Sequence, residues 1–177
     1  MSMNVNRALL QDGLQVLVGL PLSIVRNAAD MKVLHFGTIR PHRSGRGTVG
    51  EYALHIQCPW RIVSESVVIT GTSDRFVALQ GGAGRNDDVP QSQNLQFIRI
   101  AALLKGFDEA TKSFINTTEQ LVVMTASADT YGGADLALSG GYRLQIFPDG
   151  SLEEDWRFIQ DEGRHFVIEG GRVRIDE

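Results

Sequence analysis

The clearest pattern in the chain is an alternation of apolar and polar residues between positions 51 and 62. Every second side chain is apolar or aromatic, and those between are mostly polar. The alternating set is Tyr52, Leu54, Ile56, Cys58, Trp60 and Ile62. Because successive side chains of a strand point to opposite faces, this period of two predicts a strand with one buried face. The residues that we expect in or near the core are Tyr52, Leu54, Ile56, Trp60, Ile62, Leu144, Ile146 and Trp156.

Shorter apolar runs bounded by glycine and proline predict further strands. These runs are 14–18, 30–36, 49–57, 60–64, 67–71, 121–128, 136–138, 142–147, 152–159, 165–169 and 172–175. Apolar spacings of three and four predict one principal helix at 94–104 with Asn94 as its N-cap, and a further helical turn at 108–114. The pattern predicts an α+β fold of mainly antiparallel sheet, arranged as a meander or as two related sheets.

The chain length of 177 residues favours a single domain over 1–177. One order of features occurs twice: a strand, then Trp-Arg-apolar, then an apolar strand that ends in glycine. Trp60 opens one copy and Trp156 the other. The order suggests two related β-meander halves, about 14–71 and 121–177, with the two tryptophans in similar environments. An ordinary meander gives the same order, so both interpretations stay open.

Composition limits the classes of function. The formal charge of −4 and the acidic pI of about 5.6 disfavour general nucleic-acid binding. A single cysteine, Cys58, cannot form an internal disulfide or a thiolate zinc cluster. No apolar run approaches the roughly 18–20 residues that cross a bilayer, and the first residues are too polar for a secretory signal. We therefore expect a cytoplasmic protein that does not enter a membrane.

The residues that could carry chemistry do not form a recognisable catalytic or metal motif. The four histidines are His35, His42, His55 and His165. Their spacing is not that of a metal site, so we expect no metal, no cofactor and no catalytic residue. His35 and His55 could neighbour each other on adjacent strands. Cys58 belongs to the apolar set and is expected to be a buried structural thiol. The glycine-rich segment 81–90 lacks the Lys-Ser or Lys-Thr of a phosphate loop.

Two clusters of opposite charge stand out. The basic loop 38–48 carries Arg40, His42, Arg43 and Arg46, and the acidic cluster contains Asp149, Glu153, Glu154, Asp155, Asp161 and Glu162. Both can be solvated surfaces. They can also make complementary contacts between subunits or with a charged partner.

Two motifs carry a resemblance to known proteins. The run from Gly50 to Ile62, GEYALHIQCPWRI, resembles a motif of uncharacterised bacterial proteins with no assigned activity. Phe147-Pro148-Asp149-Gly150 with Trp156-Arg157-Phe158 resembles the end of small β-rich domains, some of which are thought to be immunity proteins of toxin systems. The resemblance implies no catalytic residues.

These observations favour a non-enzymatic binding or interaction module of immunity type, acting through self-association or a protein partner. The alternative is an enzyme or small-molecule-binding protein with a pocket near His35, His55 and the loops 38–48 and 81–90, because irregular loops on a rigid sheet often form sites. The expected contact residues are Arg40, His42, Arg43, Arg46, His35 and His55. Contact of the three arginines with nucleic acid is a less favoured interpretation.

Overall fold

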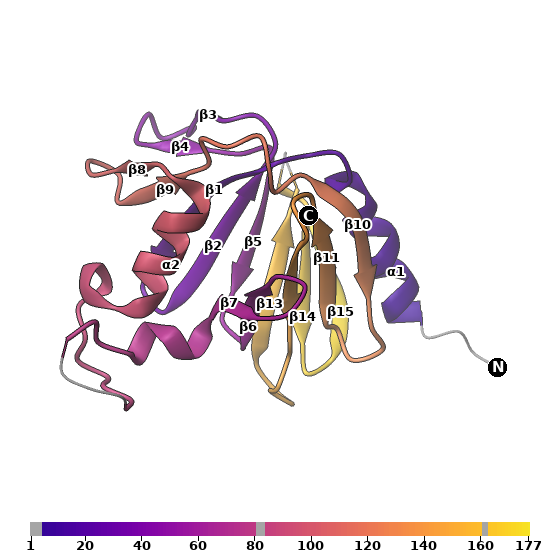
Figure 1. The fold of residues 1–177 in the computed structure, drawn as a ribbon. Coiled ribbons are helices and arrows are strands. Elements are labelled where there is room, and N and C mark those ends of the chain that lie inside the picture. The colour runs from indigo at the N-terminus through magenta and orange to yellow at the C-terminus, as the bar shows by residue number, and fades with distance from the viewer. Residues whose placement is uncertain (1–4, 81–83, 161–162) are drawn as a thin grey trace.

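Antiparallel β-sheet dominates the fold, which a computed structural model describes for residues 5–80, 84–160 and 163–177 (Figure 1). Within these ranges the strands form two main sheets and a small hairpin. In spatial order the larger sheet contains β15 (Arg172–Asp176), β14 (His165–Glu169), β13 (Glu154–Ile159), β5 (Tyr52–Ile56), β2 (Met31–Phe36), β1 (Leu22–Ala28), β9 (Ser113–Ile115) and β8 (Phe107–Asp108). The smaller sheet contains β10 (Val123–Ala128), β11 (Ala134–Leu138), β12 (Tyr142–Ile146), β6 (Trp60–Val63) and β7 (Val68–Gly71), while β3 (Arg40–Pro41) and β4 (Thr48–Val49) make the hairpin. The predicted α+β class with mainly antiparallel sheet is confirmed.

The segment 52–62 passes from one sheet to the other and keeps one side buried throughout. β5 belongs to the larger sheet and β6 to the smaller one. At the change of sheet, the backbone N–H groups of Gln57 and Cys58 both donate to Asp155 O, at 2.9 and 3.0 Å. Seven of the eight residues expected in the core are at most 5% exposed, and Tyr52 is half-buried against them. The alternation of buried and exposed side chains continues through the change of sheet because the inner faces of both sheets cover the same core.

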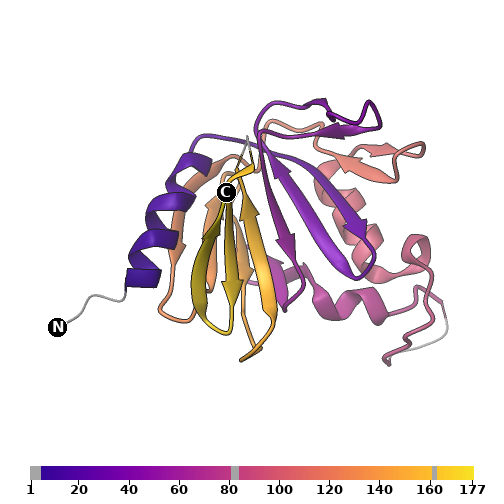
Figure 2. The ribbon, with the colours of Figure 1, turned by 180° about the vertical axis from the view of Figure 1, so that it is seen from behind.

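Two helices close the open sides between the sheets (Figures 1 and 2). α1 (Val5–Leu14), continued by the 3-10 turn η1 (Gln15–Leu17), packs beside β10 and β15. α2 (Leu95–Leu104) packs beside β7 and β9, next to the 3-10 turns η2 (Thr72–Phe76) and η3 (Gln91–Gln93). Among the described residues, neither these helices nor any other has the length and apolar character to cross a bilayer.

The helices also cover the edges of the smaller sheet with glutamine side chains. Gln11 Nε2 donates to Ala126 O at 2.7 Å, and Gln11 Oε1 accepts from Ala128 N at 2.7 Å. On the opposite edge, Gln96 Nε2 donates to Gly71 O at 2.9 Å. An edge strand has unpaired backbone groups, and an amide side chain offers both a donor and an acceptor. The glutamines therefore replace part of the missing neighbouring strand.

The helix predicted at 94–104 is confirmed. Asn94 Oδ1 accepts from Phe97 N at 2.8 Å, which is the N-cap bond expected from the sequence. The helix ends at Lys105, which has left-handed backbone with φ of 60°.

The strand predicted at 14–18 is wrong, because this segment is the end of α1 and the turn η1. Leu14 and Leu17 are fully buried, and their spacing of three suits a helix that packs on the core. Gly13 lies inside the helix. A Cβ there would lie 2.8 Å from Phe166 Cζ, so the glycine permits close approach of α1 to the larger sheet.

The helical turn predicted at 108–114 is also wrong, because β8, a tight turn and β9 occupy that segment. Asp108 organises the turn: its Oδ1 accepts from Ala110 N and its Oδ2 from Thr111 Oγ1, both at 2.9 Å. An aspartate that bonds the backbone two residues ahead offers the chain an alternative to a helix.

Strands from the segments 14–71 and 121–177 mix in both sheets. β13 lies next to β5 in the larger sheet, and β12 lies next to β6 in the smaller one. Trp156 is fully buried in the larger sheet, where its Nε1 donates to Gly132 O at 2.8 Å. Trp60 is 5% exposed and lies in the smaller sheet.

Candidate functional site

His35 and His55 lie together on the outer face of the larger sheet. His35 pairs with Ala53 across β2 and β5, two residues from His55. The neighbouring pair, Leu34 and Leu54, belongs to the core. Because side chains alternate between faces, both histidines point away from the core on adjacent strands.

A third histidine completes a row across four strands of this face, which is turned to the viewer in Figure 2. His35 pairs with Ala53, Ala53 with Ile159, and Ile159 with His165. Three strand spacings separate His35 from His165, which is about 14 Å. The side chains of Ala53 and Ile159 stand between the two imidazoles. The row therefore has a polar group at each end and two apolar side chains in the middle.

A pocket of about 530 Å³ lies over this row. The residues that form its floor include His35, Ala53, His55, Ile159 and His165. The β3–β4 hairpin contributes Arg40, His42 and Arg43 to the wall. Glu51 also lines the pocket, and its Oε2 accepts from Thr38 N at 2.7 Å. The wall is therefore mainly cationic.

Hydrogen bonds between backbone groups and side chains hold the hairpin against the sheet and fix the tautomer of His35. The Arg26 guanidinium donates to Thr48 O in β4. Gly50 N donates to His35 Nδ1 at 3.3 Å. A Cβ on Gly50 would lie 2.6 Å from Phe36 O, so only glycine fits this approach. Since Nδ1 accepts a bond, the ring hydrogen of neutral His35 is on Nε2.

Burial keeps the His35 and His55 rings neutral at physiological pH. Desolvation, followed by the nearby charge of Arg26, lowers the pKa of His35 to about 3. Desolvation, followed by the charge of Arg157, lowers the pKa of His55 to about 4. Both groups lose their proton far below pH 7, because the buried charged form is disfavoured and cations lie close.

An ion pair orients the third histidine. Arg157 donates to both carboxylate oxygens of Glu154, at 2.7 and 2.6 Å, and to His165 Nδ1 at 3.0 Å. These bonds lower the pKa of Glu154 and raise that of Arg157. A guanidinium can only donate, so His165 Nδ1 accepts and its hydrogen is on Nε2. Two imidazole N–H donors, on His35 and His165, thus belong to one pocket.

The histidines do not converge as metal ligands. In the described part of the chain, no group of three or more His, Cys, Asp or Glu side chains could hold a metal ion. The reason is the row itself, since ligands on strands about 14 Å apart cannot reach one ion at about 2 Å.

The structure brings five of the six sequence-predicted contact residues into this pocket. They are His35, Arg40, His42, Arg43 and His55. Arg46 lies on the same hairpin, is exposed and is not part of the lining. The described residues 84–90 contribute to a separate cavity with Ala78, and 81–83 lie outside the described residues.

Sequence reasoning missed His165, Arg26 and Arg157 as parts of the site. His165 opens a predicted strand, and Arg157 follows Trp156 in a quoted motif. Neither signal shows which strands pair, so the sequence could not place them beside His55.

Other candidate residues have structural surroundings. Burial, followed by the charge of Asp155, raises the pKa of the buried Cys58 thiol to about 12, which disfavours a nucleophilic role. In the acidic cluster, Glu154 is paired with Arg157, and the buried Asp155 accepts from Asp149 N and Gly150 N. Asp161 and Glu162 lie outside the described residues. A charged partner surface formed by this cluster stays a prediction.

Comparison of the chain with protein-family models, with curated proteins and with solved structures finds no match.

Proposed function

We propose that this protein is a non-enzymatic binding module whose pocket on the outer face of the larger sheet takes a small anion with a carboxylate or a phosphate group. The observation that carries the proposal is a pocket whose floor holds the neutral imidazoles of His35 and His55 together with His165, below a hairpin that contributes Arg40 and Arg43. Imidazole N–H groups donate hydrogen bonds to an anion, and guanidinium groups suit carboxylates and phosphates.

The state of the histidines favours binding over catalysis. A general base acts best when its pKa is near the working pH. His35 and His55, with pKa values of about 3 and 4, are weak bases at pH 7. The cavity of about 530 Å³ is within the range of small-molecule sites, roughly 300–1,000 Å³. The proposal places the protein in the cytoplasm; an immunity-type role and a protein partner remain separate predictions from the sequence.

Isothermal titration with inorganic phosphate and with succinate tests the proposal. We expect saturable binding of at least one of the two anions, weakened several-fold by Arg43→Gln. Arg46→Gln is the matched control, because it removes the same charge from the same hairpin outside the lining. Ala53→Leu fills the middle of the row and is expected to abolish binding. The proposal fails if neither anion binds, or if both arginine variants weaken binding equally.

A further inference from the structure

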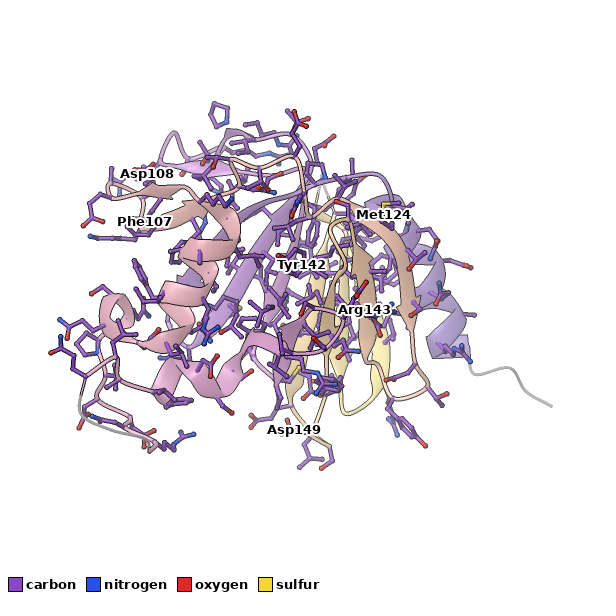
Figure 3. All side chains as sticks on the ribbon, in the orientation of Figure 1. Phe107, Asp108, Met124, Tyr142, Arg143 and Asp149 are labelled. Atoms are coloured by element: carbon purple, nitrogen blue, oxygen red, sulfur yellow. The ribbon has the colours of Figure 1, made fainter. Side chains whose placement is uncertain are left out.

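Another cavity, of about 480 Å³, lies on the α2 side of the fold. Phe97 of α2, Phe107 of β8 and Phe114 of β9 line it, and their ring centroids are 4.8 to 5.2 Å apart. Figure 3 labels Phe107 close to α2, where its side chain is 38% exposed. Lys112 and Glu109, paired at 2.8 Å, also line the cavity. The cavity thus has an aromatic wall that a planar apolar group can contact.

Asn27 is a polar residue of the cavity wall, and the orientation of its side-chain amide is fixed. Lys32 Nζ donates to Asn27 Oδ1. An ammonium group can only donate, so the oxygen of the amide is turned to the lysine. No acceptor among the described residues bonds to Asn27 Nδ2. Asn27 therefore has an N–H donor available to a ligand, with an ammonium group directly behind it.

Lys32 is a buried cation without a counter-ion in the described part of the chain. It is 5% exposed and lies on the inner side of β2, with Nζ 5.8 Å from the centre of the Trp60 ring. The charged groups near it are Arg75 and, through an ion pair of 2.7 Å with Arg75, Asp30. A buried charge is costly unless an opposite charge or several hydrogen bonds compensate it. Burial and Arg75 lower the pKa of Lys32 to about 7, as expected for an uncompensated cation.

We propose that this cavity binds a small aromatic carboxylate, whose ring packs on the phenylalanines while its carboxylate accepts from Asn27 beside Lys32. Charge complementarity selects this class of ligand. A carboxylate supplies the negative charge that the buried ammonium lacks, whereas a cation would be repelled by it. The site is independent of the histidine pocket, which lies on the other face of the larger sheet.

Titration of the full chain with phenylacetate, compared with its neutral isostere phenylacetamide, tests the proposal. We expect phenylacetate to bind about ten-fold more tightly or better, since a hydrogen bond to a charged acceptor is stronger than one to a neutral acceptor. The anion also favours the protonated form of Lys32. Binding at pH 7.5 should therefore take up protons, measured as a difference in heat between buffers of unlike ionisation enthalpy.

Three variants separate the proposal from a non-specific aromatic contact. Lys32→Met is expected to remove the preference for phenylacetate and the proton uptake, whereas Lys105→Met, at the exposed end of α2, changes neither. Asn27→Asp places a carboxylate beside the ammonium and is expected to abolish phenylacetate binding even if Lys32→Met folds poorly. Phe107→Ala should weaken both ligands. Equal affinity for the two ligands, no phenylacetate binding at millimolar concentration, or unchanged binding in Asn27→Asp would overturn the proposal.

Discussion

Replacing Lys32 by methionine is expected to stabilise the protein, and the gain should depend on pH. Lys32 is 5% exposed, and burial lowers its pKa from the ordinary 10.5 to about 7. Below pH 7 the lysine is charged in both the folded and the unfolded chain, so the full cost of the buried charge is present. Between pH 7 and 10.5 the unfolded chain binds more protons than the folded one. The stability of the wild-type protein therefore rises with pH in this window.

The magnitude follows from the difference between the two pKa values. At about 1.4 kcal/mol per pKa unit, the fall from 10.5 to about 7 corresponds to at most about 5 kcal/mol of free energy of unfolding. Methionine retains an unbranched apolar chain but loses the bond to Asn27 and the contact with the Trp60 ring. These losses, each about 1 kcal/mol, leave an expected gain of about 2–3 kcal/mol at pH 7.

Urea denaturation of wild type and Lys32→Met at intervals between pH 6 and pH 9.5 measures this effect. The gain should be constant below pH 7 and should shrink by up to about 1.4 kcal/mol per pH unit above it. Lys105→Met, which removes an exposed lysine, should show no such trend. A Lys32→Met protein less stable than wild type at every pH, or a gain independent of pH, would refute the argument from burial.

Three further predictions concern the histidine pocket and the sheet edges. The free energy of unfolding should fall as the pH drops from about 6.5 towards 4, by about 1 kcal/mol per pH unit for each of His35 and His55, because the unfolded chain takes up protons that the folded chain does not bind. His55→Gln should reduce the slope of the urea denaturation midpoint against pH. An unchanged slope would contradict the lowered pKa of His55. Gln96→Leu leaves Gly71 O without its partner and should cost about 1–2 kcal/mol in urea denaturation; a neutral result would show that water replaces the amide. Gln11→Leu exposes the edge of β10 and should promote self-association beyond that of the wild type in sedimentation at high concentration, whereas a variant that sediments like the wild type would show that α1 covers the edge without it.

Much of the fold could be predicted because the signals are local. The alternation at 52–62 predicted burial correctly, since a strand with one buried face requires a period of two whichever sheet contains it. Asn94 predicted the start of α2 through a bond to a residue three positions away. The strand predicted at 14–18 was wrong because its local signal is ambiguous. At 14–18 the apolar run suited a strand or a helix, and packing of Leu14 and Leu17 on the core decided for a helix.

The candidate site shows the limit of local signals. The basic hairpin and the nearness of His35 to His55 could be inferred, because they lie on consecutive predicted strands. His165 could not, since it reaches the row only through the pairing of β13 with β5, more than a hundred residues apart in the chain. Lys32 gave no signal of burial, because a lysine between apolar residues also suits a solvated strand face.

The sequence by itself therefore determined which side of the segment 52–62 is buried and where α2 begins, since side-chain periodicity and helix capping act over a few residues. The tertiary structure alone decided the change of sheet at 57–59, the row of histidines and the buried ammonium of Lys32. These features depend on cross-strand register and on packing between the sheets, which arise only when distant segments of the chain come together.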